Sequence, residues 1–452
     1  MKNLKLPENL KVISENNKHI LLHPKRPIWT VVNNSGLMIA KLIDGTRNSE
    51  DIANVIAKRF NIDKQTALGD VKNYIEHLTK TGLFQDSVKF NKRDGFSKMD
   101  LYVTENCNLR CIHCAVSDGS FKKDHLDLKM IKSLVDQYAE LGGQAVNLIG
   151  GEPLLRNDLK EIIDYSTKKI DIIIPTNAVL INDEWSEFLS KYDNITIQIS
   201  IDGGTAEIHD RIRGKGTFAK VMKAVDSLKK YGNLDKICFS YVIMKTNINS
   251  VKDVIDLGER LEIPEVRFTL IHKAGNAYSS WKELNSETRD YINIYKYLYD
   301  ELLNDKRKIR IVPGLEGFYL YFKDKNQEDM WCNVGRTFCI DHAGYVFPCS
   351  LFKIEGMSIG NVFESSLKEI AESKKFLDFE NVCKERKNQI EECRNCPFVN
   401  FCQAGCPARS YVLYNDINKV DFMCEFKKEL FKKMILECSD AKLKMLKSDD
   451  MV

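Results

Sequence analysis

The sequence lacks an apolar run long enough to cross a membrane, and its first residues lack the charged-then-apolar pattern of a secretory signal. It also lacks a dominant charge, because 67 basic and 64 acidic residues leave a net charge of only +3. So small a charge gives no reason to expect a general polyanion partner. We therefore expect a cytoplasmic protein with no membrane partner and no nucleic-acid partner.

The fourteen cysteines form two groups and one isolated residue. Three lie at 107–114, ten lie between Cys332 and Cys438, and Cys238 stands alone in an apolar stretch, where we expect a core residue. Disulfides are disfavoured in the reducing cytoplasm, so clustered cysteines indicate metal or redox chemistry. The 452 residues are too many for one hydrophobic core and should form two to four domains.

Cys107, Cys111 and Cys114 share one short loop. The alternation of apolar and polar residues over 99–104 predicts a strand before this loop, and the periodicity of 126–141 predicts a helix after it. In α/β folds, reactive groups gather in the loops at the carboxyl ends of strands. Three thiolates can converge on one soft metal centre, and they would leave one iron of a four-iron cluster without a cysteine. Three buried structural cysteines or a partial zinc site are the alternatives.

The central part of the chain repeats a strand followed by a helix. Strands are predicted at 101–104, 145–149, 170–174, 195–201, 237–243 and 265–270. Six parallel strands with right-handed crossovers form an open, partial (β/α)6 barrel, and the loops after the strands form its active rim.

Those loops carry polar and glycine motifs. Gly150 and Gly151 would let the backbone approach a ligand closely, and Glu152, before Pro153, can accept a hydrogen bond from a cationic amine. Thr176-Asn177-Ala178 follows the third strand. Ser200 and Arg213 could together hold a carboxylate and a ribose. Taken singly, an ordinary strand–helix turn or a surface ion pair also explains each motif.

The cysteine spacing and these loops together resemble the radical S-adenosylmethionine (radical SAM) family. The resemblance implies that S-adenosylmethionine chelates the open iron of a 4Fe-4S cluster held by Cys107, Cys111 and Cys114, and is cleaved to methionine and a 5′-deoxyadenosyl radical. It places the cofactor contacts at His113, Gly150, Gly151, Glu152, Pro153, Asn177, Ser200, Arg213, Asn247 and Gly275. Two positions depart from the family pattern: His113 replaces a large apolar side chain but can stack on adenine, and Ala178 replaces a glycine.

The C-terminal part has seven cysteines in a regular spacing, which is too many for one metal site and indicates two clusters or two structural zinc sites. The pattern resembles the SPASM domain, an auxiliary-cluster domain of radical SAM enzymes that act on peptides. The resemblance implies a distal cluster on Cys393, Cys396, Cys402 and Cys424 and a proximal one on Cys332, Cys349 and Cys406. Cys339 is a candidate fourth proximal ligand or a core residue. Without it, one iron would be open to a substrate thiolate. Cys383 and Cys438 receive no role.

The N-terminal 92 residues contain no cysteine and predict three short strands with three helices, a winged-helix arrangement. Asn48 should cap the second helix, which is expected to bury Ile52, Val55, Ile56 and Phe60. No stripe of Lys and Arg marks a DNA-recognition helix. The stretch 34–45 resembles the PqqD-like peptide-recognition domain, in which a leader peptide adds a strand to the sheet edge. DNA binding and a purely structural cap are the alternatives.

These features predict an α/β protein with four parts. They are a PqqD-like winged-helix domain (1–92), a radical SAM partial barrel (93–310), a SPASM domain with two auxiliary clusters (311–430) and a C-terminal helical tail (431–452). The locally basic stretch 427–447 is expected to form a solvated helix face. With three 4Fe-4S clusters and an external flavodoxin- or ferredoxin-type electron donor, the protein is expected to install a thioether in a ribosomal precursor peptide held by its leader. Ser350 follows Cys349 where sulfatase-activating relatives carry an aspartate, which disfavours formylglycine formation. Carbon–carbon cross-linking, decarboxylation, epimerisation and a non-catalytic iron- or redox-sensing regulator are the alternatives.

Overall fold

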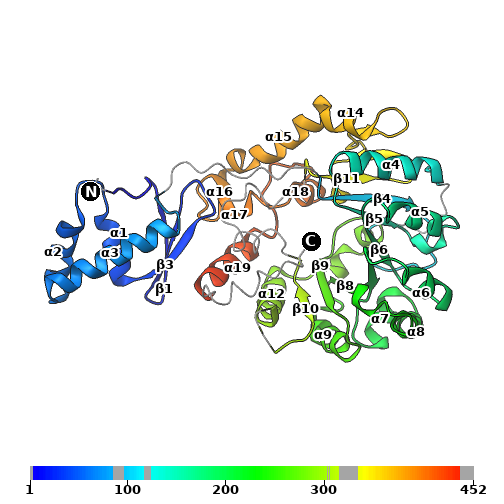
Figure 1. Ribbon diagram of the computed structural model, residues 1–452, viewed down its shortest axis with the longest axis horizontal. Coiled ribbons are helices and arrows are strands. Elements are labelled where there is room, and N and C mark those ends of the chain that lie inside the picture. The colour runs from blue at the N-terminus through cyan, green and yellow to red at the C-terminus, as the bar shows by residue number, and fades with distance from the viewer. Residues whose placement is uncertain are drawn as a thin grey trace.

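The computed structural model describes residues 4–84, 96–116, 124–302, 304, 306–314 and 334–437. Cys332 and Cys438 lie outside these residues. A small α/β domain, a group of C-terminal helices and a large barrel follow one another along the longest axis (Figure 1). No helix in the described part of the chain is long and apolar enough to cross a membrane.

The N-terminal domain has the predicted three strands and three helices. They are β1 (Lys11–Glu15), β2 (Lys18–Leu22), β3 (Trp29–Asn33), α1 (Asn34–Leu42), α2 (Ser49–Phe60) and α3 (Lys64–Lys80). The sheet is antiparallel in the order β1-β2-β3. Asn48 and Asp51 form the capping box that starts α2. Ile52 and Ile56 are buried as predicted, but Phe60 is 47% exposed and Val55 is also exposed, because the core needs only a narrow stripe of this helix.

One face of this sheet packs against the C-terminal helices. The ring of Trp29 on β3 lies 5.5 Å from that of Phe401 in α17 (Val399–Cys402). Lys432 in α19 (Cys424–Glu437) forms an ion pair with Glu15 at 2.6 Å. Asn400 donates to the backbone oxygen of Pro24 at 3.1 Å. The N-terminal domain is therefore held against the cysteine-rich segment.

The central sheet confirms the predicted partial barrel. Its parallel strands are β4 (Lys98–Thr104), β5 (Ala145–Gly150), β6 (Asp171–Thr176), β7 (Ile195–Ser200), β8 (Ile237–Ile243), β9 (Glu265–Leu270) and β10 (Arg310–Val312). The main helices are α4 (Leu128–Glu140), α5 (Leu159–Ser166), α6 (Asp183–Leu189), α7 (Ala206–Arg213), α8 (Thr217–Lys230), α9 (Val251–Arg260) and α12 (Thr288–Leu302), with short α10 (Asn276–Ser279) and α11 (Trp281–Leu284). The seventh strand, β10, was not predicted because three residues give too little periodicity.

Alternation along β7 shows how these strands position the site. Ile195, Ile197 and Ile199 are buried in the main hydrophobic core, whereas the alternate residues, ending at Ser200, are half-buried. One face of the strand therefore packs in the core while the other carries polar side chains. The ends of these parallel strands bring distant loops to one rim.

The C-terminal segment continues the same sheet. Here β11 (Thr337–Ile340) pairs in parallel with β4, and β12 (Tyr345–Phe347) and β13 (Gly360–Asn361) follow antiparallel. The remaining helices are α14 (Leu367–Glu372), α15 (Lys374–Gln389), α16 (Glu391–Arg394), α17, α18 (Pro407–Tyr414) and α19. The helix α19 continues without a break across residue 430, where the sequence predicted the boundary between the SPASM domain and the tail. It packs on α12, and the rings of Phe426 and Tyr295 lie 4.9 Å apart. Lys427 on this helix is buried, so the expected solvated basic face is wrong at that position.

Candidate functional site

The loop after β4 carries the three clustered cysteines at the rim. Cys111 is buried, and Cys107 and Cys114 are half-buried. The pKa of the Cys111 thiol is raised to about 11, chiefly by burial; Arg213 acts against this rise, and the charges of Cys114, Asp202 and Cys107 add to it. The charge of Cys114 acts on both Cys107 and Cys111, so the three sulfurs lie near one another at the rim.

Gly150 and Gly151 bring the next rim loop against this cysteine loop. The Gly151 N–H donates to the Thr104 oxygen at 2.9 Å, and the Glu152 N–H donates to the Asn106 oxygen at 2.8 Å. A Cβ on Gly150 would clash with the Thr104 oxygen, and one on Gly151 with the Asn106 oxygen. The two glycines were expected to let the backbone approach a ligand closely; in the structure they let it approach the backbone of the cysteine loop.

The Glu152 carboxylate is fully buried and holds the third rim loop. It accepts from the Thr176 hydroxyl at 2.7 Å and from the Asn177 N–H at 2.7 Å. The Asn177 amide in turn donates to the Asn108 Oδ1 at 2.7 Å, inside the cysteine loop. Ala178, where the family pattern has glycine, adopts a left-handed φ of 60°. The family has glycine at this position because glycine adopts a left-handed φ without strain.

Asp202 and Arg213 lie beside Cys111. The Arg213 Nε donates to the Asp202 Oδ2 at 2.6 Å, and its Nη1 lies 4.0 Å from the Cys111 Sγ. His113 is also buried, with its Nε2 3.4 Å from the Asp202 Oδ2. Burial lowers the pKa of His113 to about 4 despite that carboxylate. Its Nδ1 has no hydrogen-bond partner among the described residues. A buried ring nitrogen without a partner, close to the thiols, is typical of a site that binds a ligand.

Gly275 and Asn276 approach from the loop after β9. The Asn276 N–H donates to the Cys114 oxygen at 2.8 Å and its side chain to the Cys111 oxygen at 3.1 Å. Gly275 has φ 51°, and a Cβ there would meet the Cys114 oxygen. Asn247 is different, because its amide donates to the backbone oxygens of Asp202 and Val242 and accepts from Met244. Asn247 therefore shapes the loop after β8.

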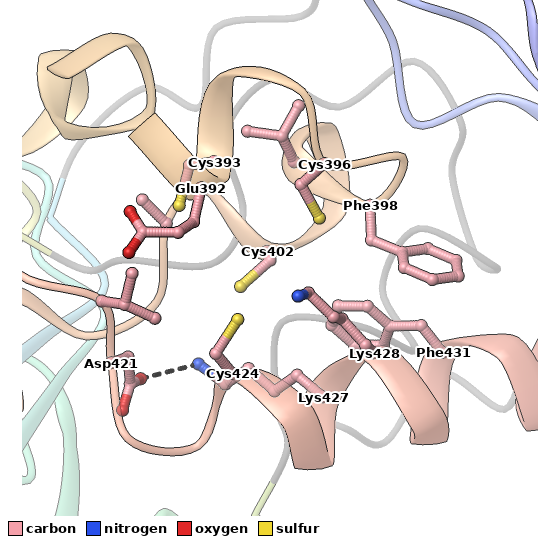
Figure 2. A pocket seen from close by; sticks show the side chains of 13 residues that line it. Glu392, Cys393, Cys396, Phe398, Cys402, Asp421, Cys424, Lys427, Lys428 and Phe431 are labelled. Atoms are coloured by element: carbon pink, nitrogen blue, oxygen red, sulfur yellow. Dashed lines mark hydrogen bonds and ion pairs between the residues drawn. The ribbon is translucent and has the colours of Figure 1, made fainter. Parts of the chain in front are cut away.

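The four predicted distal cysteines surround one cavity. Cys393 comes from α16, Cys396 from the turn after it, Cys402 from the end of α17 and Cys424 from the start of α19. Figure 2 shows their sulfurs directed toward this common space. No group of three or more His, Cys, Asp or Glu side chains in the described ranges is spaced to hold a single metal ion. Four convergent thiols are the donor set of an iron–sulfur cluster.

A buried charge network connects this cavity to Cys406. The Asp421 carboxylate accepts from Lys427 at 2.9 Å, from Arg409 at 2.6 Å and from the Cys406 N–H at 2.9 Å (Figure 2 shows the Lys427 contact). Burial acts to raise the pKa of Asp421, but Arg409 and Lys427 outweigh it and hold that pKa well below its usual range. This network was not predictable from the sequence, since its members are ordinary charged residues on two helices, α18 and α19, and the loop between them.

The predicted proximal ligands Cys349 and Cys406 pack around a second apolar cluster. Cys339 lies elsewhere, in a buried group with Tyr102 and Phe347. Cys332, the remaining predicted ligand, lies outside the described residues. The chemistry of the donors fits an iron–sulfur cluster, whose irons take cysteine thiolates.

An apolar groove runs along the edge of the N-terminal sheet. Val31 and Val32 on β3, Ile39 on α1, Phe60 on α2 and Tyr74 on α3 line it. The Tyr74 hydroxyl has no hydrogen-bond partner within the described part of the chain. Within the described part of the chain, β3 is an edge strand, so one side of it has no neighbouring strand, and it lies beside a groove lined largely by apolar side chains.

Three protein families match parts of this chain. The radical SAM superfamily matches residues 101–258, the SPASM iron–sulfur cluster-binding domain matches 332–397, and coenzyme PQQ synthesis protein D (PqqD) matches 18–83. The chain therefore contains a radical SAM domain, with a PqqD-like domain before it and a SPASM domain after it. The radical SAM and SPASM domains imply S-adenosylmethionine and iron–sulfur clusters as cofactors.

The chain is similar to a curated maturase and to solved structures of SuiB. The chain is 28% identical over 324 residues to the mycofactocin maturase MftC of Mycobacterium ulcerans, covering 68% of this chain and 82% of that protein. It shares its fold with Streptococcus suis SuiB bound to S-adenosylmethionine, at a TM-score of 0.61 and 16% identity, covering 93% of this chain and 100% of that one. The structure of SuiB bound to precursor peptide SuiA gives a TM-score of 0.62 at 15% identity, over 93% and 99% of the two chains.

Proposed function

We propose that the protein is a peptide maturase that binds the leader of a ribosomally made precursor peptide and joins a cysteine sulfur of that peptide to a carbon of another residue. The observation that carries the leader site is the apolar groove along β3. An extended peptide can add a strand to such an edge, with backbone hydrogen bonds for affinity and pockets for specificity. The Tyr74 hydroxyl, which has no hydrogen-bond partner among the described residues, is proposed to bond to a polar group of the leader.

The rim supports the radical chemistry. When bound, the rim cluster would supply the electron that cleaves S-adenosylmethionine. Cys107, Cys111 and Cys114 would hold that cluster, and Asp202 fixes Arg213 beside it, where a guanidinium can bind the cofactor's carboxylate. Ser200 and Gly275 lie on the same rim and are proposed to contact the nucleoside. Glu152 and Asn177 hold the loops that shape this pocket.

The formation of each thioether removes two hydrogens from the peptide. One leaves the carbon as a hydrogen atom and completes 5′-deoxyadenosine. The other would leave the thiol as a proton, and an auxiliary cluster would accept the remaining electron. The proposal includes two auxiliary clusters, which with the rim cluster make three 4Fe-4S clusters. It also includes an external electron donor of the flavodoxin or ferredoxin type that would reduce the rim cluster.

The residue after Cys349 distinguishes this reaction from formylglycine formation. Ser350 stands at that position, and its hydroxyl donates to the Asp100 Oδ2 at 2.7 Å. It therefore supplies no carboxylate of its own to act as a base. Carbon–carbon cross-linking, decarboxylation and epimerisation are the competing peptide reactions, and the product mass separates most of them.

The test uses reconstituted, oxygen-free protein with reductant, S-adenosylmethionine and the peptide of a neighbouring short, cysteine-containing reading frame. We expect 5′-deoxyadenosine and a peptide that has lost two hydrogens per link, with the link mapped to a cysteine sulfur by fragmentation. Loss of carbon dioxide or a link between two carbons would overturn the thioether assignment. Absence of 5′-deoxyadenosine would overturn catalysis and favour a sensor.

The leader site has its own test by fluorescence anisotropy with the labelled leader. Phe60→Ser removes an apolar side chain that lines the groove, whereas Val55→Ser changes an exposed residue of the same helix outside it. We expect weaker leader binding for Phe60→Ser alone. Equal affinities in both variants, or preferential binding of duplex DNA, would contradict a leader site here.

A further inference from the structure

We propose that Cys383 is a protein ligand of the auxiliary iron–sulfur cluster held by Cys349 and Cys406. Cys383 lies in α15, is buried, and belongs to the apolar cluster against which Cys349 and Cys406 pack. The sequence spacing gave this cysteine no role. The inference rests on the proposed function only in that the chain carries a proximal auxiliary cluster.

Arg386 fixes one side of the relevant face of α15. Its guanidinium is fully buried and donates to the Gly405 oxygen at 3.0 Å and to the Ser410 hydroxyl at 3.1 Å. Gly405 immediately precedes Cys406, and the Ser410 hydroxyl bonds to the Cys406 oxygen at 3.2 Å. Residues three apart share a helix face. Cys383, three residues before Arg386, is therefore on the face that is bound to the Cys406 segment.

Phe379 fixes the same face one turn earlier. Its ring packs edge-to-face on that of Phe352, with centroids 4.9 Å apart. The Phe352 N–H donates to the Cys349 oxygen at 3.0 Å, so this contact ties the helix to the Cys349 turn. Cys383 lies four residues after Phe379 and thus between the two contacts. The Cys383 thiol therefore lies between the Cys349 and Cys406 segments, where a further ligand of their cluster is needed.

Cys339 competes for the same role and is placed less well. It is in the middle of the sheet, opposite Asp100 on β4 and Phe347 on β12. Its buried neighbours are Tyr102 and Phe347. Cys349 is near enough for its charge to contribute to the raised pKa of Cys339, after burial and Asp100. Cys349 and Cys406 nevertheless both pack against the apolar cluster that contains Cys383, and neither packs against the one that contains Cys339.

Ligation by Cys383 changes what the proximal cluster can do. Together with the three cysteines that the SPASM pattern predicts, it would leave no iron open to a substrate thiolate. The cluster would then accept the electron released on cross-linking and would not bind the sulfur that is joined. The peptide thiolate would be positioned by the protein alone.

The experiment uses the full chain with Cys107, Cys111 and Cys114 all changed to alanine, so that only auxiliary clusters remain. This parent should bind about eight irons per chain after anaerobic reconstitution. Adding Cys383→Ala should lower the iron content toward about four or change the electron paramagnetic resonance spectrum of one reduced cluster. Adding Cys339→Ala, the matched control, should do neither. Circular dichroism of each variant reports whether the fold is kept.

A small thiol gives a second readout. Added to the reduced protein, 2-mercaptoethanol should shift the spectrum of the Cys383→Ala variant, in which an iron has lost its ligand, and leave the parent unchanged. Cys383→Asp should restore part of the iron content, since a carboxylate can also ligate iron. Iron and spectra unchanged in Cys383→Ala, or an effect of Cys339→Ala at least as large, would overturn the proposal. Neither result depends on a peptide substrate.

Discussion

Arg213 donates through Nε to the Oδ2 of Asp202 at 2.6 Å while its Nη1 reaches to within 4.0 Å of the Cys111 Sγ. Asp202 is fully buried and also accepts the Val242 N–H at 3.0 Å. One carboxylate on the loop after β7 thus orients a guanidinium over the cysteine loop after β4. Two rim loops far apart in sequence are coupled at the place where a cofactor carboxylate would bind.

Arg213→Gln tests this pair. The substitution leaves the buried Asp202 carboxylate without its cation, which should lower the free energy of unfolding by about 3–5 kcal/mol. Affinity for S-adenosylmethionine, measured anaerobically by equilibrium dialysis, should fall as well. Arg211→Gln is the control, because Arg211 is exposed and, among the described residues, donates to a backbone oxygen, that of Thr246 at 2.8 Å. Equal effects of the two substitutions would show that Arg213 has no special role.

Gly151→Ala should disturb the rim cluster without touching a ligand. The new Cβ would clash with the backbone oxygen of Asn106, next to Cys107, and the cysteine loop would have to move. We expect a loss of about four irons per chain. Gly69→Ala is the control: no atom lies near its Cβ, and alanine in α3 should stabilise the helix by about 0.5–1 kcal/mol. Full iron content in Gly151→Ala would contradict this tight packing.

Lys427→Met should destabilise the C-terminal segment. Lys427 and Asp421 are each 2% exposed and lie 2.9 Å apart, so the substitution removes a charged hydrogen bond worth about 2 kcal/mol from a carboxylate that keeps only Arg409 as a cation. The urea midpoint measured without oxygen should fall. Lys428→Met, which removes the neighbouring partly exposed lysine, should change the midpoint little. The opposite ranking would mean that the network contributes little to stability.

Lowering the pH should reduce the free energy of unfolding through protonation of His209. Burial, with Arg213 nearby, lowers its pKa to about 4, against about 6.5 in an unfolded chain. Between these values the unfolded state binds more protons than the folded one, so stability is lost as the pH falls below about 6.5. From pH 7.5 to 5.5 this group alone should cost about 1 kcal/mol.

His209→Gln removes that proton uptake, and the glutamine oxygen can still accept the Asp202 N–H that His209 Nδ1 accepts at 3.3 Å. The unfolding free energies of the parent and this variant should therefore converge at acidic pH. A constant difference between them from pH 7.5 to 5.5 would show that His209 does not titrate as described.

Local patterns in the sequence were enough for the strand–helix repeat and for the helix cap at Asn48, because each depends on residues close in the chain. The set of four distal cysteines was implied by the resemblance to the SPASM domain, and the structure places these cysteines around one cavity. Contacts between distant segments were not predictable. Gly151 is glycine because of the Asn106 backbone, and β11 pairs with β4 across more than two hundred residues. Lys427 and Arg386 look like surface residues of polar helices, and only their buried acceptors show otherwise.

The most direct test of the account is the formation of 5′-deoxyadenosine by anaerobically reconstituted, reduced protein supplied with S-adenosylmethionine. We predict that the parent produces it and that Cys111→Ala, which lacks one of the three rim thiols, does not. Equal production by both proteins, or a parent that contains zinc in place of iron and produces none, would contradict the account.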